Sequence, residues 1–301
     1  MTRKIALFLG MTFSINWIMA GLFWALGGRW NTPQAVILGV LYMFVPALCA
    51  VIVQKGIYRQ PMRIPLGISF RLNRWFLVAW LLPPVLSFVS VGVSLLLPDI
   101  SLSPNASGFF ERYSSILPPE RLEEMRRQME EMPINPIWLS LIQGLTAGAT
   151  INAVAAFGEE LGWRGFLQRE LSDMGFWRSS LLIGLIWGIW HAPIILQGHN
   201  YPQHPTSGVL MMTAFCLLLG PIFSYIRVKS RSVIAAAVAH GSLNGTAGIS
   251  ILILKGGSDL TVGLLGFAGL IVLALTNFIL FLKWRRGGDE GAFPDVIRGA
   301  A

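Results

Sequence analysis

Eight apolar segments, each close to 20 residues long, dominate this chain of 301 residues and limit it to a helical fold within a lipid bilayer. A helix needs about 20 mostly apolar residues to cross the hydrocarbon core. Only helices and closed barrels satisfy their backbone hydrogen bonds there. The segments cover residues 5–26, 34–54, 75–97, 137–158, 179–197, 207–226, 233–254 and 260–282.

The composition supports the same conclusion. Hydrophobic residues make up 54% of the chain and charged residues 13%, with a mean hydropathy of +0.61. Soluble domains are about 45–50% apolar and about 25% charged. We therefore predict an all-α, polytopic, integral membrane bundle of about eight helices that forms a single domain over residues 1–301. The alternative for Arg3, Lys4 and the following apolar run is a signal peptide, but its removal would leave an odd number of spans.

The lysines and arginines are distributed unevenly between the two sides of the predicted bundle. If the N-terminus is cytoplasmic, 17 of the 23 basic residues lie on the cytoplasmic side. Cytoplasmic loops carry the excess of basic residues in membrane proteins, so we predict that both termini are cytoplasmic. The net charge of +8 follows from this placement and indicates no nucleic-acid partner. The cytoplasmic set is Arg3, Lys4, Lys55, Arg59, Arg63, Arg71, Arg74, Arg164, Arg169, Arg178, Arg227, Lys229, Arg231, Lys283, Arg285, Arg286 and Arg298.

The one long loop, residues 98–136, is predicted to be external and to contain an amphipathic helix. In its second half, residues 119–132, Leu122, Met125, Met129 and Met132 recur at helical spacing among mostly charged residues. Such a helix lies on the membrane interface or caps the bundle, and the functional alternative is a substrate gate. Cys49 and Cys216 lie in apolar segments and are read as free packing residues rather than a disulfide framework.

Two adjacent glutamates, Glu159 and Glu160, follow the fourth apolar segment. An ionised carboxylate in the bilayer costs on the order of several kcal/mol, so it needs a partner or a function. Arg164 lies four residues after Glu160, a spacing at which a helix forms an ion pair. Glu159 is rotated about 100° away and is free to face a cavity. The alternative is an ordinary ion pair at a solvated helix end.

Two later segments carry further polar residues. His191 lies between apolar neighbours, and Pro193 predicts a kink just after it. A lone histidine there is more often a packing residue than a catalyst. His240 and Asn244 share one helix face at a spacing of four residues. Together with the glutamates, these residues predict one polar cavity inside the bundle.

Such a cavity contains the groups required to hydrolyse a peptide bond. Glu159 can act as a general base on water, and His191 can position that water. His240 and Asn244 can stabilise the oxyanion of a tetrahedral intermediate. No serine or cysteine beside a base suggests a covalent route.

Glu159, His191 and His240 are also candidate zinc ligands, because two histidines and a carboxylate form a plausible zinc site. The sequence has no His-Glu-x-x-His helix, and these ligands come from three distant segments. Zinc is therefore a possible cofactor that the sequence neither requires nor excludes. His199 and His204 are read as residues of an external loop and not as ligands.

The three motifs, Glu159-Glu160-x-x-x-Arg164, aromatic-x-x-x-His191 and His240-x-x-x-Asn244, together resemble those of the CPBP (Abi) family. That family includes type II CAAX prenyl endopeptidases and bacteriocin-processing or immunity proteins. The resemblance implies an eight-helix intramembrane protease with a core at about 137–254, whose active site opens toward the cytoplasm of a bacterial-type cell membrane.

The resemblance also implies roles for individual residues. Glu159 is the base, Glu160 is its companion and Arg164 supports both glutamates. His191 joins Glu159 around the water, and His240 with Asn244 forms the oxyanion site. Trp187 stands where the family often has Phe.

The leading prediction is an intramembrane endopeptidase whose partners are the lipid bilayer and a membrane-associated or lipidated peptide or protein substrate. The first alternative is a non-catalytic protein of the same fold that binds a partner or confers immunity. The second alternative is a proton-coupled transporter. The sequence argues against it, because it shows no sign of two matching halves with broken helices.

Overall fold

The computed structural model describes residues 2–30, 32–103, 105–114, 117–287 and 293–298, and most of these residues are helical. Seven of the helices are long and apolar enough to cross a membrane, and two further helices joined by a bend can form an eighth crossing. The predicted polytopic helical bundle is therefore confirmed.

The first helices are α1 (Arg3–Ala25), α2 (Pro33–Val51), α3 (Arg74–Ser94), α4 (Ser107–Tyr113), α5 (Pro119–Glu130), α6 (Pro136–Ala149), α7 (Ile151–Glu160) and α8 (Gln168–Glu170). They are followed by α9 (Phe176–Trp190), α10 (Ala192–Leu196), α11 (Pro205–Ser230), α12 (Val233–Thr246), α13 (Ile249–Ile253), α14 (Phe267–Gly287) and α15 (Phe293–Arg298). π-Helical turns cover Ile52–Ile57 and Leu161–Leu167, and a 3₁₀ turn covers Ser172–Met174. The strands β1 (Ser101–Leu102) and β2 (Leu254–Lys255) pair antiparallel.

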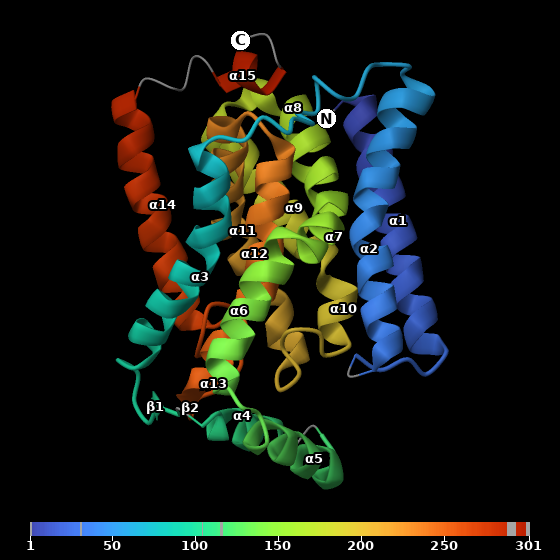
Figure 1. Ribbon diagram of the computed structural model, residues 1–301. Coiled ribbons are helices and arrows are strands. Elements are labelled where there is room, and N and C mark those ends of the chain that lie inside the picture. Colours follow the sequence, from blue (N-terminus) through green and yellow to red (C-terminus); the bar gives the residue numbers. More distant parts are fainter. Residues whose placement is uncertain (1, 31, 104, 115–116, 288–292, 299–301) are drawn as a thin grey trace.

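Both ends of the chain lie at one end of the bundle, and α4, α5 and the two strands lie at the other (Figure 1). The helices α1 and α2 pack together at one edge, and α14 lies at the opposite edge against α3 and α11. Between these edges, α9 packs on α11 and α12 packs on α7. The predicted functional residues are carried by these central helices.

The fourth span is bent, whereas the sequence predicted a continuous apolar segment over 137–158. α6 and α7 meet at an angle of 50°, and the residue between them, Thr150, has non-helical backbone angles (φ −121°, ψ −100°). Thr146 and Thr150 turn their hydroxyls back onto carbonyls one turn earlier, at 2.8 and 2.7 Å. Such back-bonding bends helices. The predicted continuation past the glutamates is present, since Leu161–Leu167 follows α7 directly.

Glycines allow α6 and α12 to pack with their backbones in contact. A Cβ atom on Gly144 would overlap the carbonyl group of Gly245, and one on Gly148 would come within 2.6 Å of Cα of Ser242. Small residues permit this close approach of membrane helices, where lipid supplies little hydrophobic driving force. The contact fixes α12 against the bent span that carries Glu159.

Two span boundaries have clear local causes. His191 separates α9 from α10, and Pro193 follows within the first turn of α10, as the predicted kink requires. α12 begins after Arg231, which is left-handed at φ 56°, and Ser232, whose hydroxyl accepts from the backbone N–H of Ile234 at 3.2 Å. The last membrane helix begins at Phe267 rather than at the expected residue 260.

The glycine contact can be tested with Gly144→Leu. Because the added side chain would overlap the backbone of α12, we expect a loss of unfolding free energy of about 1–3 kcal/mol and a lower thermal midpoint in detergent micelles. Gly10→Leu is the matched control, since a Cβ on Gly10 meets nothing within 4 Å. Equal midpoints for the two variants would contradict the proposed close packing of α6 on α12.

Candidate active site

A buried ion cluster forms where α7 meets α12. Oε1 of Glu160 lies 3.0 Å from Nη1 of Arg164 and 2.9 Å from Nδ1 of His240. Glu160 and Arg164 are both 0% exposed, and His240 is 4% exposed. The predicted ion pair of Glu160 and Arg164 is thus present. The bond from His240 was not predicted, because nothing in the sequence sets the register of α12 against α7.

Arg164 lies among aromatic rings as well as beside a carboxylate. Its guanidinium carbon is 4.5 Å from the ring centre of Trp187 and 5.3 Å from that of Phe223. A cation over an aromatic face gains electrostatic energy, on the order of 2 kcal/mol when desolvated. The π-helical turn Leu161–Leu167 carries this arginine, and such turns are frequent at functional sites.

Glu159 has different neighbours from Glu160. Its side chain is only 2% exposed, and Oε2 accepts a hydrogen bond from the indole Nε1 of Trp187 at 2.6 Å. The adjacent glutamates therefore point into different environments, as the 100° rotation between consecutive helical residues predicts. In the sequence, Trp187 is identified only as the aromatic residue of the second motif. The sequence does not predict that its indole donates a hydrogen bond to Glu159.

The side chain of His191 contacts the backbone of the same tryptophan. Nδ1 of His191 lies 2.8 Å from the carbonyl oxygen of Trp187. Because a carbonyl only accepts hydrogen bonds, the proton of the neutral ring is on Nδ1, and Nε2 is left as an acceptor. Among the described residues, no hydrogen bond joins His191 to Glu159; Trp187 links them instead.

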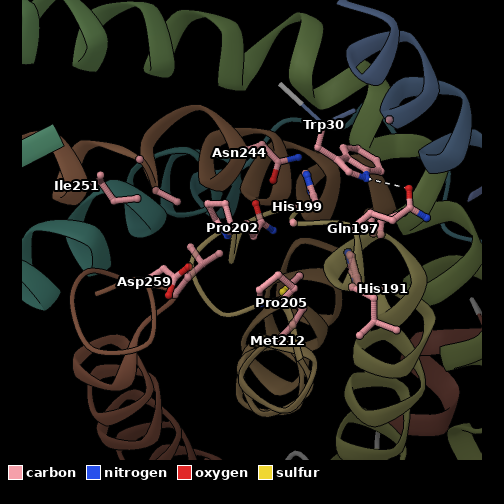
Figure 2. A pocket seen from close by; sticks show the side chains of 18 of the residues that line it. Trp30, His191, Gln197, His199, Pro202, Pro205, Met212, Asn244, Ile251 and Asp259 are labelled. Carbon is pink, nitrogen blue, oxygen red and sulfur yellow. Dashed lines mark hydrogen bonds between the residues drawn. The ribbon is translucent and has the colours of Figure 1, made fainter. Parts of the chain in front are cut away.

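One large cavity, of about 1490 Å³, brings the predicted site residues together. Glu159, His191, His240 and Asn244 all line it, and Asn244 is exposed within it. Figure 2 shows His191 at the corner between α9 and α10 and Asn244 on α12 among the lining side chains. Glu160 is absent from the lining among the described residues and lies behind Glu159 in the ion cluster.

The helices α1 and α2, which carry none of the three motifs, also form part of the cavity wall. Asn16 on α1 donates to the carbonyl oxygen of Tyr42 on α2 at 2.9 Å, and Tyr42 donates its hydroxyl to the carbonyl oxygen of Trp190 at 3.0 Å. The indole of Trp190 donates back to Asn16 at 2.9 Å. This closed ring of hydrogen bonds ties α1 and α2 to α9. The only sequence signal was one asparagine in an apolar run.

The three candidate zinc ligands do not form a metal-binding group. In the part of the chain that the structure describes, no three His, Cys, Asp or Glu side chains are placed so that they could hold a metal ion. The residues therefore do not fit a zinc centre as they are arranged.

The cavity opens at the end of the bundle opposite to both termini. Its lining continues from Glu159 to Arg112 on α4 and Arg121 on α5, and these two helices lie at the far end from the N- and C-termini (Figure 1). Arg121 and the lining residue Asn200 are exposed there. The side of the membrane on which the cavity opens, expected from the sequence to be cytoplasmic, stays a prediction.

The rim of this opening is held by the two loop histidines. Nδ1 of His204 lies 2.6 Å from Oδ1 of Asp259, which ties the 197–205 loop to the segment before α14. His199 packs against the indole of Trp30, with ring centres 4.6 Å apart. Burial lowers the pKa of His199 from 6.5 to about 4, since burial disfavours the charged imidazolium.

The ion cluster can be tested with Arg164→Met. Removing the arginine leaves a buried carboxylate without its cation, a change that costs about 3–5 kcal/mol of unfolding free energy. We expect a large drop in the thermal midpoint of the purified protein. Arg169→Met is the control, because Arg169 is partly exposed and pairs with the surface residue Glu170. If both variants lose the same stability, the buried cluster has no special role.

His199 predicts a pH dependence. Its folded-state pKa is below its unfolded value, so the unfolded chain binds more protons between pH 6.5 and about 4, and stability falls as the pH drops through this window. His199→Phe keeps a ring against Trp30 but cannot titrate. We therefore expect a smaller fall in thermal midpoint between pH 7 and pH 5 than in the wild type. Identical falls would rule out His199 as a source of the pH dependence.

Comparison with known proteins bears on the same segment. Residues 136–246 match the family model "Type II CAAX prenyl endopeptidase Rce1-like". The chain is also 33% identical over 98 residues to a "CAAX prenyl protease 2" of Methanococcus maripaludis. That alignment covers 30% of this chain and 36% of the relative, so the chain spans about a third of the length of the curated relative that it matches.

The family match includes the helices that carry the three motifs, from the bent span through α12. The resemblance drawn from Glu159, His191, His240 and their neighbours is thereby confirmed at the level of the family. Residues 136–246 of this membrane protein are thus similar to the Rce1-like family of type II CAAX prenyl endopeptidases.

Proposed function

We propose that the chain is an intramembrane endopeptidase that hydrolyses a peptide bond of a membrane-associated or lipidated substrate. The single observation that carries the proposal is the buried Glu159 carboxylate, which lines a large cavity together with His191, His240 and Asn244. The family match of residues 136–246 supports the same reaction class.

In the proposed first step, Glu159 removes a proton from a water molecule, and the resulting hydroxide attacks the carbonyl carbon of the scissile bond. The short bond from Trp187 to Oε2 holds the carboxylate and leaves Oε1 for the water. The acceptor nitrogen of His191 can hold the same water by taking a hydrogen bond from its second proton. Positioned general bases contribute about 10²–10⁴-fold to rate.

The tetrahedral intermediate carries an oxyanion that needs hydrogen-bond donors. Asn244 supplies the N–H groups of an exposed side-chain amide. His240 already directs Nδ1 to Glu160, and a carboxylate oxygen can accept a hydrogen bond from N–H at that position. The far nitrogen, Nε2, can then donate to the oxyanion only when it is protonated too.

Collapse of the intermediate breaks the carbon–nitrogen bond. The carboxyl group of Glu159 returns its proton to the departing amine, and the carbonyl forms again on the new carboxyl product. Atoms and charges balance with water as the only co-substrate. Glu160 and Arg164 contact no substrate in this scheme and act as positioning residues for His240 and Glu159.

The proposal is tested with Glu159→Gln, which keeps the shape of the side chain and removes the base. The purified protein would be given quenched CAAX peptides, with and without a prenyl group, and membrane fractions of cells would be compared by proteomics for an accumulating precursor. We expect cleavage to fall at least about 100-fold, with unchanged membrane insertion.

Glu170→Gln is the matched control, because Glu170 lies on the same bent span but pairs with Lys4 outside the cavity. It should cleave at the wild-type rate. Full activity of Glu159→Gln would refute Glu159 as the base. A wild-type protein that processes no peptide and leaves no precursor difference would favour the partner-binding alternative.

A further inference from the structure

Arg227, near the end of α11, is a buried cation that no carboxylate neutralises among the described residues. The residue is 2% exposed, and its Nε has no hydrogen-bond partner. The buried carboxylate of Glu160 is already engaged by Arg164 and His240. An uncompensated charge inside a protein is strongly destabilising, so buried charges are paired. Arg227 therefore requires an anionic partner of its own.

Gln168 lies at the same level as Arg227 and is also without a partner. Arg164 contacts Phe223 on α11, with 5.3 Å between the guanidinium carbon and the ring centre. The segment 161–170 and α11 both run from there toward the end that holds the termini (Figure 1). Gln168 and Arg227 each follow about one turn later, on the faces that make this contact. Gln168 is 0% exposed, and neither its Nε2 nor its Oε1 has a hydrogen-bond partner among the described residues.

The connector between α2 and α3 covers both side chains. A Cβ atom on Gly67 would overlap the guanidinium of Arg227, and one on Gly165 would come within 3.3 Å of the carbonyl oxygen of Leu66. The dipeptide Leu66-Gly67 therefore spans from the segment 161–170 to α11. Gly67 has a left-handed backbone (φ 67°), which glycine adopts without strain. Leu66 is fully buried, so the connector closes the space around Arg227.

From these observations we propose that Arg227, Gln168 and Ser224 form a binding site for a small monovalent anion of the halide class, such as chloride. Ser224 lies three residues before Arg227, and its buried hydroxyl has no partner among the described residues. Guanidinium, amide and hydroxyl groups all supply the hydrogen-bond donors that an anion needs. One negative charge balances Arg227. The three residues are at most 2% exposed, and this enclosure suits a compact ion rather than a phosphate headgroup.

The anion site is separate from the proposed catalytic cavity. None of Arg227, Gln168 and Ser224 lines that cavity among the described residues. The bound anion joins α11 to the segment 161–170, which also carries Arg164 of the ion cluster. Its role is to hold these two elements and the connector together. Anion binding can therefore be measured without substrate, and its outcome does not depend on whether the protein cleaves peptides.

The site is tested by the thermal midpoint of the full-length protein in detergent, in sodium chloride against sodium gluconate at equal ionic strength. An ion that binds only the folded state stabilises it, so we expect chloride to raise the midpoint saturably by at least about 3 °C. Arg227→Met and Gln168→Leu should abolish this rise. Arg71→Met is the matched control, because Arg71 is exposed on the connector, and it should keep the full rise.

Bromide locates the site directly. Crystals of the wild-type protein grown in bromide should show an anomalous peak between Arg227 and Gln168. A wild-type midpoint that does not respond to chloride would overturn the proposal, and so would a full rise in Arg227→Met or a bromide peak found only elsewhere. If Arg227→Met does not fold, Gln168→Leu decides, since it keeps the cation: loss of the rise supports the site, and a full rise without a peak beside Arg227 refutes it.

Discussion

The ion cluster of Glu160, Arg164 and His240 is the interaction on which the rest of the site depends. Arg164 and His240 each lie within 3.0 Å of the same Glu160 oxygen in the interior of a lipid-embedded bundle. Burying any one of these charged groups alone would cost roughly several kcal/mol of desolvation free energy. The attraction between the groups offsets that cost only while their hydrogen-bonded geometry is kept. The cluster therefore fixes α12 against α7 and, through that contact, sets where Glu159 can point.

The glycine contact makes this cluster sterically possible. With Gly144 and Gly148 against α12, the backbones approach closely enough for His240 to reach a carboxylate on the neighbouring span. The bend at Thr150 then turns α7 so that consecutive glutamates face the cluster and the cavity. Packing and charge thus act on the same pair of helices, and a change in either alters the other.

The sequence predicted the bundle and the ion pair of Glu160 with Arg164, because these follow from apolar length and helical spacing. It did not predict the bend at Thr150, the bond from Trp187 to Glu159 or the bond from His240 to Glu160. Those depend on how distant helices are rotated and shifted against one another, which no local pattern in a single sequence specifies. The end of the bundle at which the cavity opens likewise required the placement of α4 and α5 in space.

The ring of hydrogen bonds among Asn16, Tyr42 and Trp190 joins α1 and α2 to α9, which lies within the family segment 136–246. The groups proposed for chemistry lie within the family segment 136–246, while Tyr42 lines the cavity from α2, outside that segment. The proposed reacting groups and part of the wall around them thus come from different parts of the chain. The hairpin of α1 and α2 that carries this part of the wall is joined to α9 by the hydrogen bonds of Trp190 with Tyr42 and Asn16.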